Sequence, residues 1–413
     1  MAHDTADIAI VGGGIMGMSI AYQVARRSSQ RVIVLEKGAG LAEGSTGGSA
    51  AITRQRYSRP EQIRLARDGN AAFRNWAEYT GLESPLAEYH QSGVLWMLGE
   101  TREAAGRDRD RMRAEGVDAI VISAEELRER FPALSACQEP FDLTGSIEHV
   151  HRDGDAFLLE LDSGYFDATA ALEDVAAAAR REGVEIRMQA RVTGVARDRG
   201  RVTGVGLADG SVIDAGMVVN AAGPWCNEIN AMAGLDLKWD LIPTRVQVLY
   251  RDLPEEVPRP LPVVGDGSTG IYLRPESAGQ QILMGSILEE DEQEAADPET
   301  YSRVADRGFI DSKIHALHHR IPSLPYRGKV GGMAGMYTIN LQDVHPVIGP
   351  TFLDGYGVAN GFSGHGFKES QMVGGMMASW LTGERSEFDT EVPMEFFSID
   401  RDPIELEEKT VLA

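Results

Sequence analysis

Short apolar runs on either side of a helical segment mark the first 36 residues. Residues 8–11 (Ile-Ala-Ile-Val) are apolar, rich in β-branched side chains and too few for a helix, so we expect a buried strand. The pattern predicts a helix over residues 18–27 and a second, parallel strand over residues 31–36. A strand, a helix and a parallel strand in this order are the repeating unit of α/β folds.

Helical and strand patterns continue through the rest of the chain. Helices are expected over residues 61–79, 101–115, 168–181, 301–320 and 369–381, with Ser123 as the cap of a further helix. Strands are expected over residues 93–98, 185–197, 201–207, 211–214 and 215–220, and residues 270–275 should pair with residues 281–285. We interpret the charged segment 101–115 and the acidic run 289–292 as solvent-facing.

The segment between the first strand and the first helix, residues 12–17, fits the motif G-x-G-x-x-G. Gly12 allows a tight turn, Gly14 lets the backbone approach a pyrophosphate, and Gly17 lets helix and strand pack closely. The helix N-terminus then offers N–H groups and a partial positive charge to the phosphate. Glu36 ends the second strand, where a carboxylate can bind ribose hydroxyls. These features together predict a dinucleotide site more strongly than a plain glycine-rich turn, and they fit FAD and NAD equally.

Other small-residue segments extend this prediction. Residues 37–48 contain Gly44-Ser45-Thr46, whose amides and hydroxyls can surround phosphate or ribitol oxygens; a flexible surface loop is the alternative. A strand ends in Ala221-Ala222-Gly223-Pro224-Trp225, which allows close backbone approach to a ligand. Residues 361–368 (Gly-Phe-Ser-Gly-His-Gly-Phe-Lys) form a second glycine turn before a helix. We therefore expect the two glycine turns to converge on one cofactor.

Composition and charge narrow the classes of function. A chain of 413 residues has room for about two domains, and its net charge of -23 argues against nucleic acid and anionic membranes as partners. The two cysteines, Cys137 and Cys226, exclude a disulfide framework and a Cys-rich metal site, and no metal is predicted. No apolar segment reaches the roughly 18 residues of a membrane span, and no targeting segment is found, so we expect a cytoplasmic location.

The motifs at residues 12–17, 221–225 and 361–368, in this order, resemble the D-amino-acid oxidase superfamily of FAD-dependent oxidoreductases. Within it the chain is most similar to the sarcosine oxidase, dimethylglycine dehydrogenase and glycine oxidase branch. The resemblance implies an α/β, two-domain fold in which a Rossmann-like FAD-binding domain joins a substrate domain with a large antiparallel sheet. The implied FAD-binding domain comprises residues 1–88, 150–235 and 333–390, the substrate domain residues 89–149 and 236–332, and a C-terminal tail residues 391–413.

The resemblance also implies a set of contacts to FAD. Glu36 would hold the adenosine ribose, the Val192 backbone would meet adenine, Ser45 and Thr46 would lie along the pyrophosphate and ribitol, and residues 361–368 would pass the flavin ring. The expected cofactor-binding residues are Gly12, Gly14, Ile15, Met16, Gly17, Glu36, Lys37, Gly44, Ser45, Thr46, Val192, Ala222, Gly223, Trp225, Gly361, Phe362, Ser363, Gly364, Gly366, Phe367 and Lys368.

Four residues are candidates for contact with the substrate. Arg54 and Lys368 match the carboxylate-binding pattern of sarcosine oxidase; Arg grips a carboxylate with two hydrogen bonds, whereas Lys supplies a point charge. A surface ion pair is the alternative for Arg54. Tyr272 matches a pocket tyrosine of the family, with ordinary strand packing as the alternative. His365 lies in the flavin loop and is either catalytic or structural.

The chain departs from its relatives at three places. Gly335 stands where some relatives attach FAD to a cysteine, and Ser45-Thr46 is followed by Gly47 instead of the histidine-bearing sequence of others. We therefore predict non-covalent FAD. Leu283 aligns with the lysine that activates oxygen in monomeric sarcosine oxidase, so the acceptor is either oxygen or an electron-transfer partner, with a slight preference for a dehydrogenase.

The expected function is FAD-dependent oxidation of the C–N bond of a small amine that carries a carboxylate, giving an imine that water hydrolyses. An N-alkyl amino acid is the first choice, and a D-amino acid or glycine is the second. An FAD-dependent dehydrogenase of a 2-hydroxy acid or polyol phosphate is a rival in another reaction class. A flavin-bearing subunit of a multi-subunit amine oxidase is a further alternative. The sequence leaves the oligomeric state open.

Overall fold

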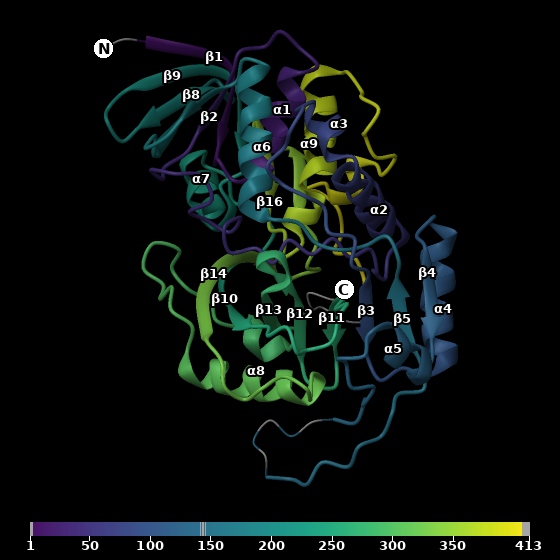
Figure 1. Cartoon of the computed structure of the whole chain (residues 1–413). Helices are drawn as coiled ribbons and strands as arrows, with labels where there is room; N and C mark the ends of the chain where they lie inside the picture. Colours follow the sequence, from purple (N-terminus) through teal and green to yellow (C-terminus); the bar gives the residue numbers. More distant parts are fainter. Residues whose placement is uncertain (1–2, 141, 143, 145, 407–413) are drawn as a thin grey trace.

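The computed structural model describes residues 3–140, 142, 144 and 146–406, which fold around two sheets (Figure 1). The chain crosses between the two sheets several times. The first sheet lies in the upper half of Figure 1 and the second in the lower half. Together with the helices that cover them, they form the mixed α/β fold that the sequence predicts.

The first sheet is built mainly from parallel strands. Its central order is β15 (Val347–Pro350), β16 (Tyr356–Asn360), β9 (Val212–Asn220), β1 (His3–Val11), β2 (Val32–Leu35) and β6 (Glu185–Arg187), and β8 (Arg201–Leu207) and β7 (Val192–Asp198) continue from β9. The strands from β16 to β6 are parallel to one another, whereas β15 is antiparallel to β16. The hairpin of β7 and β8 joins β9 antiparallel.

Both faces of this sheet are buried. Ile8 and Ile10 belong to one apolar cluster, and the alternating residues Ala9 and Val11 belong to another. Because successive side chains of a strand point to opposite faces, a strand covered on both sides must be apolar throughout. This explains the uninterrupted apolar run at residues 8–11.

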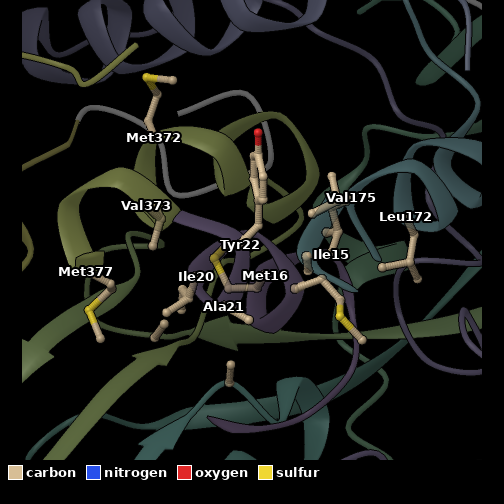
Figure 2. Close-up of a cluster of buried hydrophobic side chains, with 14 of the residues drawn as sticks. Ile15, Met16, Ile20, Ala21, Tyr22, Leu172, Val175, Met372, Val373 and Met377 are labelled. Carbon is tan, nitrogen blue, oxygen red and sulfur yellow. The ribbon is translucent and has the colours of Figure 1, made fainter. Parts of the chain in front are cut away.

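Three helices cover one face of the first sheet. These are α1 (Ile15–Ala25), α6 (Ala168–Arg181) and α9 (Gly366–Thr382). Figure 2 shows their side chains meeting in one core, with Ile20 and Tyr22 of α1 between Val175 of α6 and Val373 of α9. On the opposite face, Cys226 and Ile229 of α7 (Cys226–Met232) join the second cluster. Two further helices, α2 (Pro60–Arg74) and α3 (Trp76–Thr80), precede the second sheet in the chain.

The second sheet is largely antiparallel. Its order is β14 (Val330–Asn340), β10 (Leu241–Asp252), β13 (Gln281–Ser286), β12 (Ile271–Glu276), β11 (Val263–Asp266), β3 (Val94–Met97), β5 (Phe157–Glu160) and β4 (Ala119–Ile122). One pair, β11 with β3, is parallel. Phe309 and Leu317 of α8 (Arg307–Arg320) pack with Leu273 and Met284 of the sheet. At the far end lie α4 (Arg102–Ala114) and α5 (Ala124–Arg130), and α5 begins with a capping box between Ser123 and Glu126.

Several predicted elements have different bounds. The helix expected over 301–320 begins only at Arg307, because Arg245 donates to the carbonyl oxygens of Ser302 (2.9 Å) and Val304 (2.7 Å) and holds that segment in a non-helical path. The helix expected over 61–79 is interrupted at Asn75, whose φ and ψ are -112° and 40°. The strand expected over 185–197 is two strands, separated by Gln189 with a φ of 54°.

The remaining differences are small. The helix expected from residue 18 is α1, which starts at Ile15, and the helix expected from residue 369 is α9, which starts at Gly366. Residues 211–214 and 215–220 belong to the single strand β9. The predicted helix over 168–181 and the pairing of 270–275 with 281–285 are confirmed. Among the described residues, no helix combines the length and the apolar character needed to span a membrane.

The division of the chain into two domains remains our proposal, and strand pairing adjusts two of its boundaries. Residues 330–340 pair with β10, so the boundary expected at residue 333 would divide one strand of the second sheet. Residues 157–160, expected in the FAD-binding domain, pair with β3 and β4. Both segments are therefore better grouped with the second sheet.

Candidate active site

Four parallel strands of the first sheet end at one cavity of about 590 Å³. The strands β1, β2, β9 and β16 end at Val11, Leu35, Asn220 and Asn360. The residues that follow them, Gly12, Glu36, Ala221 and Gly361, all line the cavity. The second sheet contributes further lining residues from β10, β12 and β14. Ligands of open α/β sheets bind beyond the carboxyl ends of the strands, so this position defines a ligand site.

The first glycine turn has no room for side chains. Gly12 has a φ of 112°, and a Cβ built on it would lie 2.4 Å from the carbonyl oxygen of Ala221. A Cβ on Gly17 would lie 2.0 Å from the carbonyl oxygen of Gly12. The turn from β1 into α1 therefore packs directly against the end of β9, which requires glycine at both positions.

Glu36, which directly follows β2, hydrogen-bonds to the backbone of the same turn. Its Oε2 accepts a hydrogen bond from the Gly13 N–H (2.8 Å), and its Oε1 accepts one from the Gly38 N–H (2.7 Å). At the start of α1, the Ile15 N–H donates to Thr46 Oγ1 (3.1 Å). The helix N-terminus, a carboxylate and a hydroxyl thus meet at one end of the cavity.

A cluster of charged and aromatic side chains borders the cavity beyond Glu36. Glu299 Oε1 accepts hydrogen bonds from Lys37 Nζ (2.7 Å), Arg191 Nη2 (2.6 Å) and Trp225 Nε1 (2.7 Å). The Lys37 ammonium also lies 3.4 Å from the centroid of the Trp225 ring. The hydrogen bonds from Lys37 and Arg191 lower the pKa of Glu299 to about 2, so this carboxylate is ionised at neutral pH.

The cavity fits a flavin dinucleotide. Ser45 Oγ is buried at its wall and makes no hydrogen bond to any described residue, so a polar atom of a ligand can bind it. The glycine turn permits close approach of a pyrophosphate to the α1 N-terminus, and Glu36 offers the acceptor that a ribose needs.

Nearly all of the expected cofactor-binding residues line the cavity. Those at its wall are Gly12, Gly14, Ile15, Met16, Glu36, Lys37, Gly44, Ser45, Thr46, Val192, Ala222, Gly223, Trp225, Gly361, Phe362, Gly364, Gly366, Phe367 and Lys368. The other two, Gly17 and Ser363, lie behind the wall: Gly17 is in the first turn of α1, and Ser363 Oγ accepts a hydrogen bond from the Asn340 N–H (3.0 Å).

Two buried cations, Arg54 and Lys368, line the cavity together. The Arg54 guanidinium lies 4.0 Å from the centroid of the Tyr57 ring and donates to the carbonyl oxygen of Arg56. Its side chain is part of the cavity wall, so the alternative of a surface ion pair is wrong for Arg54. The Lys368 ammonium makes no hydrogen bond or ion pair to any other described residue.

Buried carboxylates lie behind these cations. Glu369 is fully buried next to Lys368, and its Oε1 accepts a hydrogen bond from Gln62 Nε2. Burial, together with the nearby Arg54 charge, lowers the pKa of Lys368, and burial raises the pKa of Glu369. Glu160 is also fully buried and accepts hydrogen bonds from the backbone next to Arg54. These acids partly neutralise the cationic pocket but do not enter the cavity lining.

The two other candidates differ in position. Tyr272 lines the cavity, and its side chain packs over Gly285 of the neighbouring strand, where a Cβ would lie 2.4 Å from the Tyr272 hydroxyl oxygen. Burial raises the pKa of Tyr272, so its hydroxyl stays protonated at neutral pH. His365 is fully buried behind the lining, with Nε2 3.5 Å from Arg54 Nη2 and its ring edge-on to Tyr57. We therefore propose that His365 positions Arg54.

Sequence reasoning missed two acidic residues of the cavity. Asp291 and Glu292, interpreted above as part of a solvent-facing run, line the cavity. Glu292 Oε1 accepts a hydrogen bond from the Tyr337 hydroxyl (2.8 Å), and Asp291 forms an ion pair with Lys313 (2.7 Å). Only Glu289 and Glu290 of the run are exposed to solvent. All four residues of the run are acidic, so the sequence does not indicate which of them face the cavity and which face solvent.

Comparison with known proteins identifies the class as flavin-dependent oxidoreductases. The chain belongs to the FAD dependent oxidoreductase (DAO) family, whose model matches residues 7–380. FAD-dependent oxidoreductase domain-containing protein 1 of Xenopus laevis is 26% identical over 413 residues, covering 92% of this chain and 79% of that protein. The mitochondrial dimethylglycine dehydrogenase of Homo sapiens is 27% identical over 403 residues, covering 94% of this chain and 43% of that protein.

Solved structures agree with this assignment. L-proline dehydrogenase from P. horikoshii superposes with a TM-score of 0.80 at 26% identity, covering 96% of this chain and 98% of that one. The resemblance seen in the sequence is thereby confirmed, and the chain is an FAD-dependent enzyme.

Proposed function

We propose that this enzyme oxidises the C–N bond of a small amine that carries a carboxylate, with an N-alkyl amino acid as the preferred substrate. The observation that carries the proposal is the pair of buried cations, Arg54 and Lys368, at the wall of the FAD cavity. The Lys368 ammonium is buried without a hydrogen-bonded anion, which is costly, so a substrate carboxylate at the cavity wall would stabilise it.

The names of two relatives support the amine. Dimethylglycine and L-proline, the substrates in those names, both combine a carboxylate with a nitrogen that carries a second carbon substituent. The cationic pair by itself would accept a 2-hydroxy acid equally well, because both substrates present the same carboxylate. The choice of an N-alkyl amino acid over a 2-hydroxy acid therefore rests on these relatives.

The residues of the chain have separate tasks in this proposal. Arg54 binds the carboxylate with directed hydrogen bonds, and Lys368 adds a point charge. Tyr272, with its hydroxyl protonated, lines the same cavity. When bound, FAD would supply the acceptor for a hydride equivalent from the carbon next to nitrogen, and the N–H proton of a secondary amine would be released to solvent. Water then hydrolyses the resulting imine.

An acceptor other than oxygen is the second part of the proposal. Leu283, aligned with the oxygen-activating lysine of monomeric sarcosine oxidase, is 2% exposed within β13 and supplies no charge. A cation beside the reduced cofactor would stabilise charge that develops on oxygen. Both of these relatives are named as dehydrogenases, which supports the same choice.

Anaerobic reduction tests the proposal. The holoenzyme is mixed without oxygen with N-methylglycine, N,N-dimethylglycine, L-proline, D-alanine, glycine and 2-hydroxypropanoate, and loss of the flavin's visible absorbance is followed. We expect the N-alkyl amino acids to bleach the flavin fastest and colour to return slowly when air is admitted. Bleaching by the hydroxy acid alone would overturn the reaction class, and rapid recolouring in air would overturn the choice of acceptor.

The matched pair of N-methylglycine and its carboxamide tests the carboxylate separately. The two compounds share the reacting C–N bond and differ in the negative charge. We expect the carboxamide to reduce the flavin only at much higher concentration. Equal reduction by both would show that the cationic pair does not select the substrate.

A further inference from the structure

A second cavity, of about 330 Å³, shares no described lining residue with the active-site cavity. Five of the chain's nine histidines lie at its wall, namely His149, His151, His315, His318 and His319. Histidine is the commonest metal ligand in proteins, and neither the flavin site nor the proposed reaction uses any of these side chains.

Three metal-binding side chains meet beside this cavity. Cys137 Sγ lies 3.2 Å from His149 Nε2, and the ring centroids of His149 and His319 are 4.4 Å apart. One ligand atom from each of the three residues lies within 4.8 Å of the other two. Zinc bond lengths of about 2.3 Å to sulfur and 2.0–2.1 Å to nitrogen separate tetrahedral ligand atoms by about 3.3–3.6 Å. Movements of about 1 Å therefore bring all three atoms to bonding distance.

Buried contacts hold the backbone around Cys137. Arg320, at the end of α8, forms a 2.7 Å ion pair with Asp266, and both side chains are fully buried. Arg320 Nη2 also donates to the carbonyl oxygen of Cys137 (2.8 Å), which ties the cysteine to the helix that carries His319. The backbones at Cys137 and Asp153 form an antiparallel bridge, so the chain shortly after His149 lies beside Cys137.

An ion can reach the three side chains from the second cavity. Cys137 is buried, whereas His149 and His319 are half-buried at the cavity wall, which gives an ion a path to the thiol.

We propose that Cys137, His149 and His319 bind one Zn²⁺ ion, with the fourth position open to water in the second cavity. One thiolate and two imidazoles suit a borderline-soft divalent ion of tetrahedral preference. The ion joins the segment that carries His149 to the end of α8 and has no part in the flavin chemistry. Cys137 and His149 are 12 positions apart, but His319 comes from a distant part of the chain, so no complete metal-binding motif marks the three ligands. The expectation of no metal rested only on the number of cysteines.

Metal titration of the holoenzyme tests this site. The enzyme is stripped with a chelator, dialysed, and titrated with Zn²⁺ in competition with a chromophoric chelator, and separately with Co²⁺. We expect one Zn²⁺ per chain and a thiolate-to-cobalt charge-transfer band. His319→Gln should weaken Zn²⁺ binding roughly tenfold or more, and Cys137→Ser should in addition abolish the cobalt band. His318→Gln is the matched control, because His318 lies on the same helix and lines the same cavity outside the triad.

Flavin absorbance confirms that each variant is folded, and His319→Gln carries the test if Cys137→Ser fails to fold. Zn²⁺ should raise the Tm of the wild type and of His318→Gln, and should have much less effect on His319→Gln. The proposal is overturned if the wild type binds no stoichiometric Zn²⁺, if His319→Gln binds as well as the wild type, or if His318→Gln loses binding equally.

Discussion

The carboxylate of Glu160 accepts a 2.8 Å hydrogen bond from the backbone N–H of Gln55, the residue that follows Arg54. The same carboxylate accepts hydrogen bonds from the Arg56 N–H (3.0 Å) and from Trp96 Nε1 (2.8 Å). Glu160 thus fixes the backbone from which the Arg54 side chain reaches the cavity wall. We interpret Glu160 as a positioning residue for the carboxylate pocket.

Replacement of Glu160 by glutamine tests that interpretation. One glutamine oxygen cannot accept every hydrogen bond that two carboxylate oxygens accept, and an unsatisfied buried donor costs about 1–3 kcal/mol. We expect Glu160→Gln to raise the KM for a carboxylate substrate about tenfold, with a smaller change in kcat. Glu129→Gln, at an exposed position of α5, is the control. A variant with lower Tm and unchanged KM would leave Glu160 a purely structural role.

Removal of either cation should weaken substrate binding. Loss of a charged hydrogen bond is worth about 1.5–3 kcal/mol, so Arg54→Ala and Lys368→Ala should each raise the KM for an N-alkyl amino acid about tenfold to a hundredfold. Steady-state kinetics with the carboxamide of the same substrate supply the control, because that compound lacks the charge. An unchanged KM in both variants would remove Arg54 and Lys368 from the proposed pocket.

The lowered pKa of Lys368 predicts a dependence on pH. Its ammonium loses its proton below the ordinary lysine value of 10.5. Since kcat/KM reports groups of the free enzyme, kcat/KM for a carboxylate substrate should fall as pH rises through the lowered pKa of Lys368. Lys368→Met should lack this fall and retain only the titration of the substrate amine. Identical profiles for the two enzymes would assign the pH dependence to another group.

The contact between Gly17 and Gly12 predicts a large effect of one methyl group. In Gly17→Ala the new Cβ would lie 2.0 Å from a backbone oxygen, so the helix must move, at a cost of about 1–3 kcal/mol in the free energy of unfolding. Gly308→Ala is the matched control: Gly308 is helical with open space around it, and the change should stabilise by about 0.5–1 kcal/mol. Thermal unfolding with flavin fluorescence as a second probe compares the two. Equal Tm values would show that the turn tolerates a side chain.

FAD should be released on denaturation. Among the described residues that line the active-site cavity there is no cysteine or histidine, and Gly335 occupies the position of the cysteine that attaches FAD in some relatives. Acid precipitation should therefore leave the yellow colour in the supernatant and a colourless pellet. A yellow pellet that survives washing would contradict non-covalent binding.

Much of the fold was predictable because its signals are local. The apolar run at 8–11, the glycines at 12 and 17 and the acid at 36 are set by backbone geometry within one β–α–β unit, which sequence spacing records directly. The helix over 168–181 was equally clear, since Asp167 caps its start through a hydrogen bond with the Ala170 N–H.

The remaining features depend on distant partners. The predicted helix includes residues 301–306, but the Arg245 side chain from β10 binds the carbonyl oxygens of Ser302 and Val304. Asp291 and Glu292 lie in an acidic run whose orientation is decided by Lys313 and Tyr337. The support of Arg54 by Glu160 joins residues more than a hundred positions apart, and no local pattern encodes it.

The order of the strands in the first sheet also determines when the enzyme can acquire its cofactor. β9 lies between β1, which precedes it in the chain, and β16, which follows it, and the cavity wall runs from Val11 to Lys368. A nascent chain that already contains the first glycine motif still lacks β16 and α9. We therefore expect FAD to bind only once α9 has been made, so an N-terminal fragment with an intact glycine motif should be isolated without FAD.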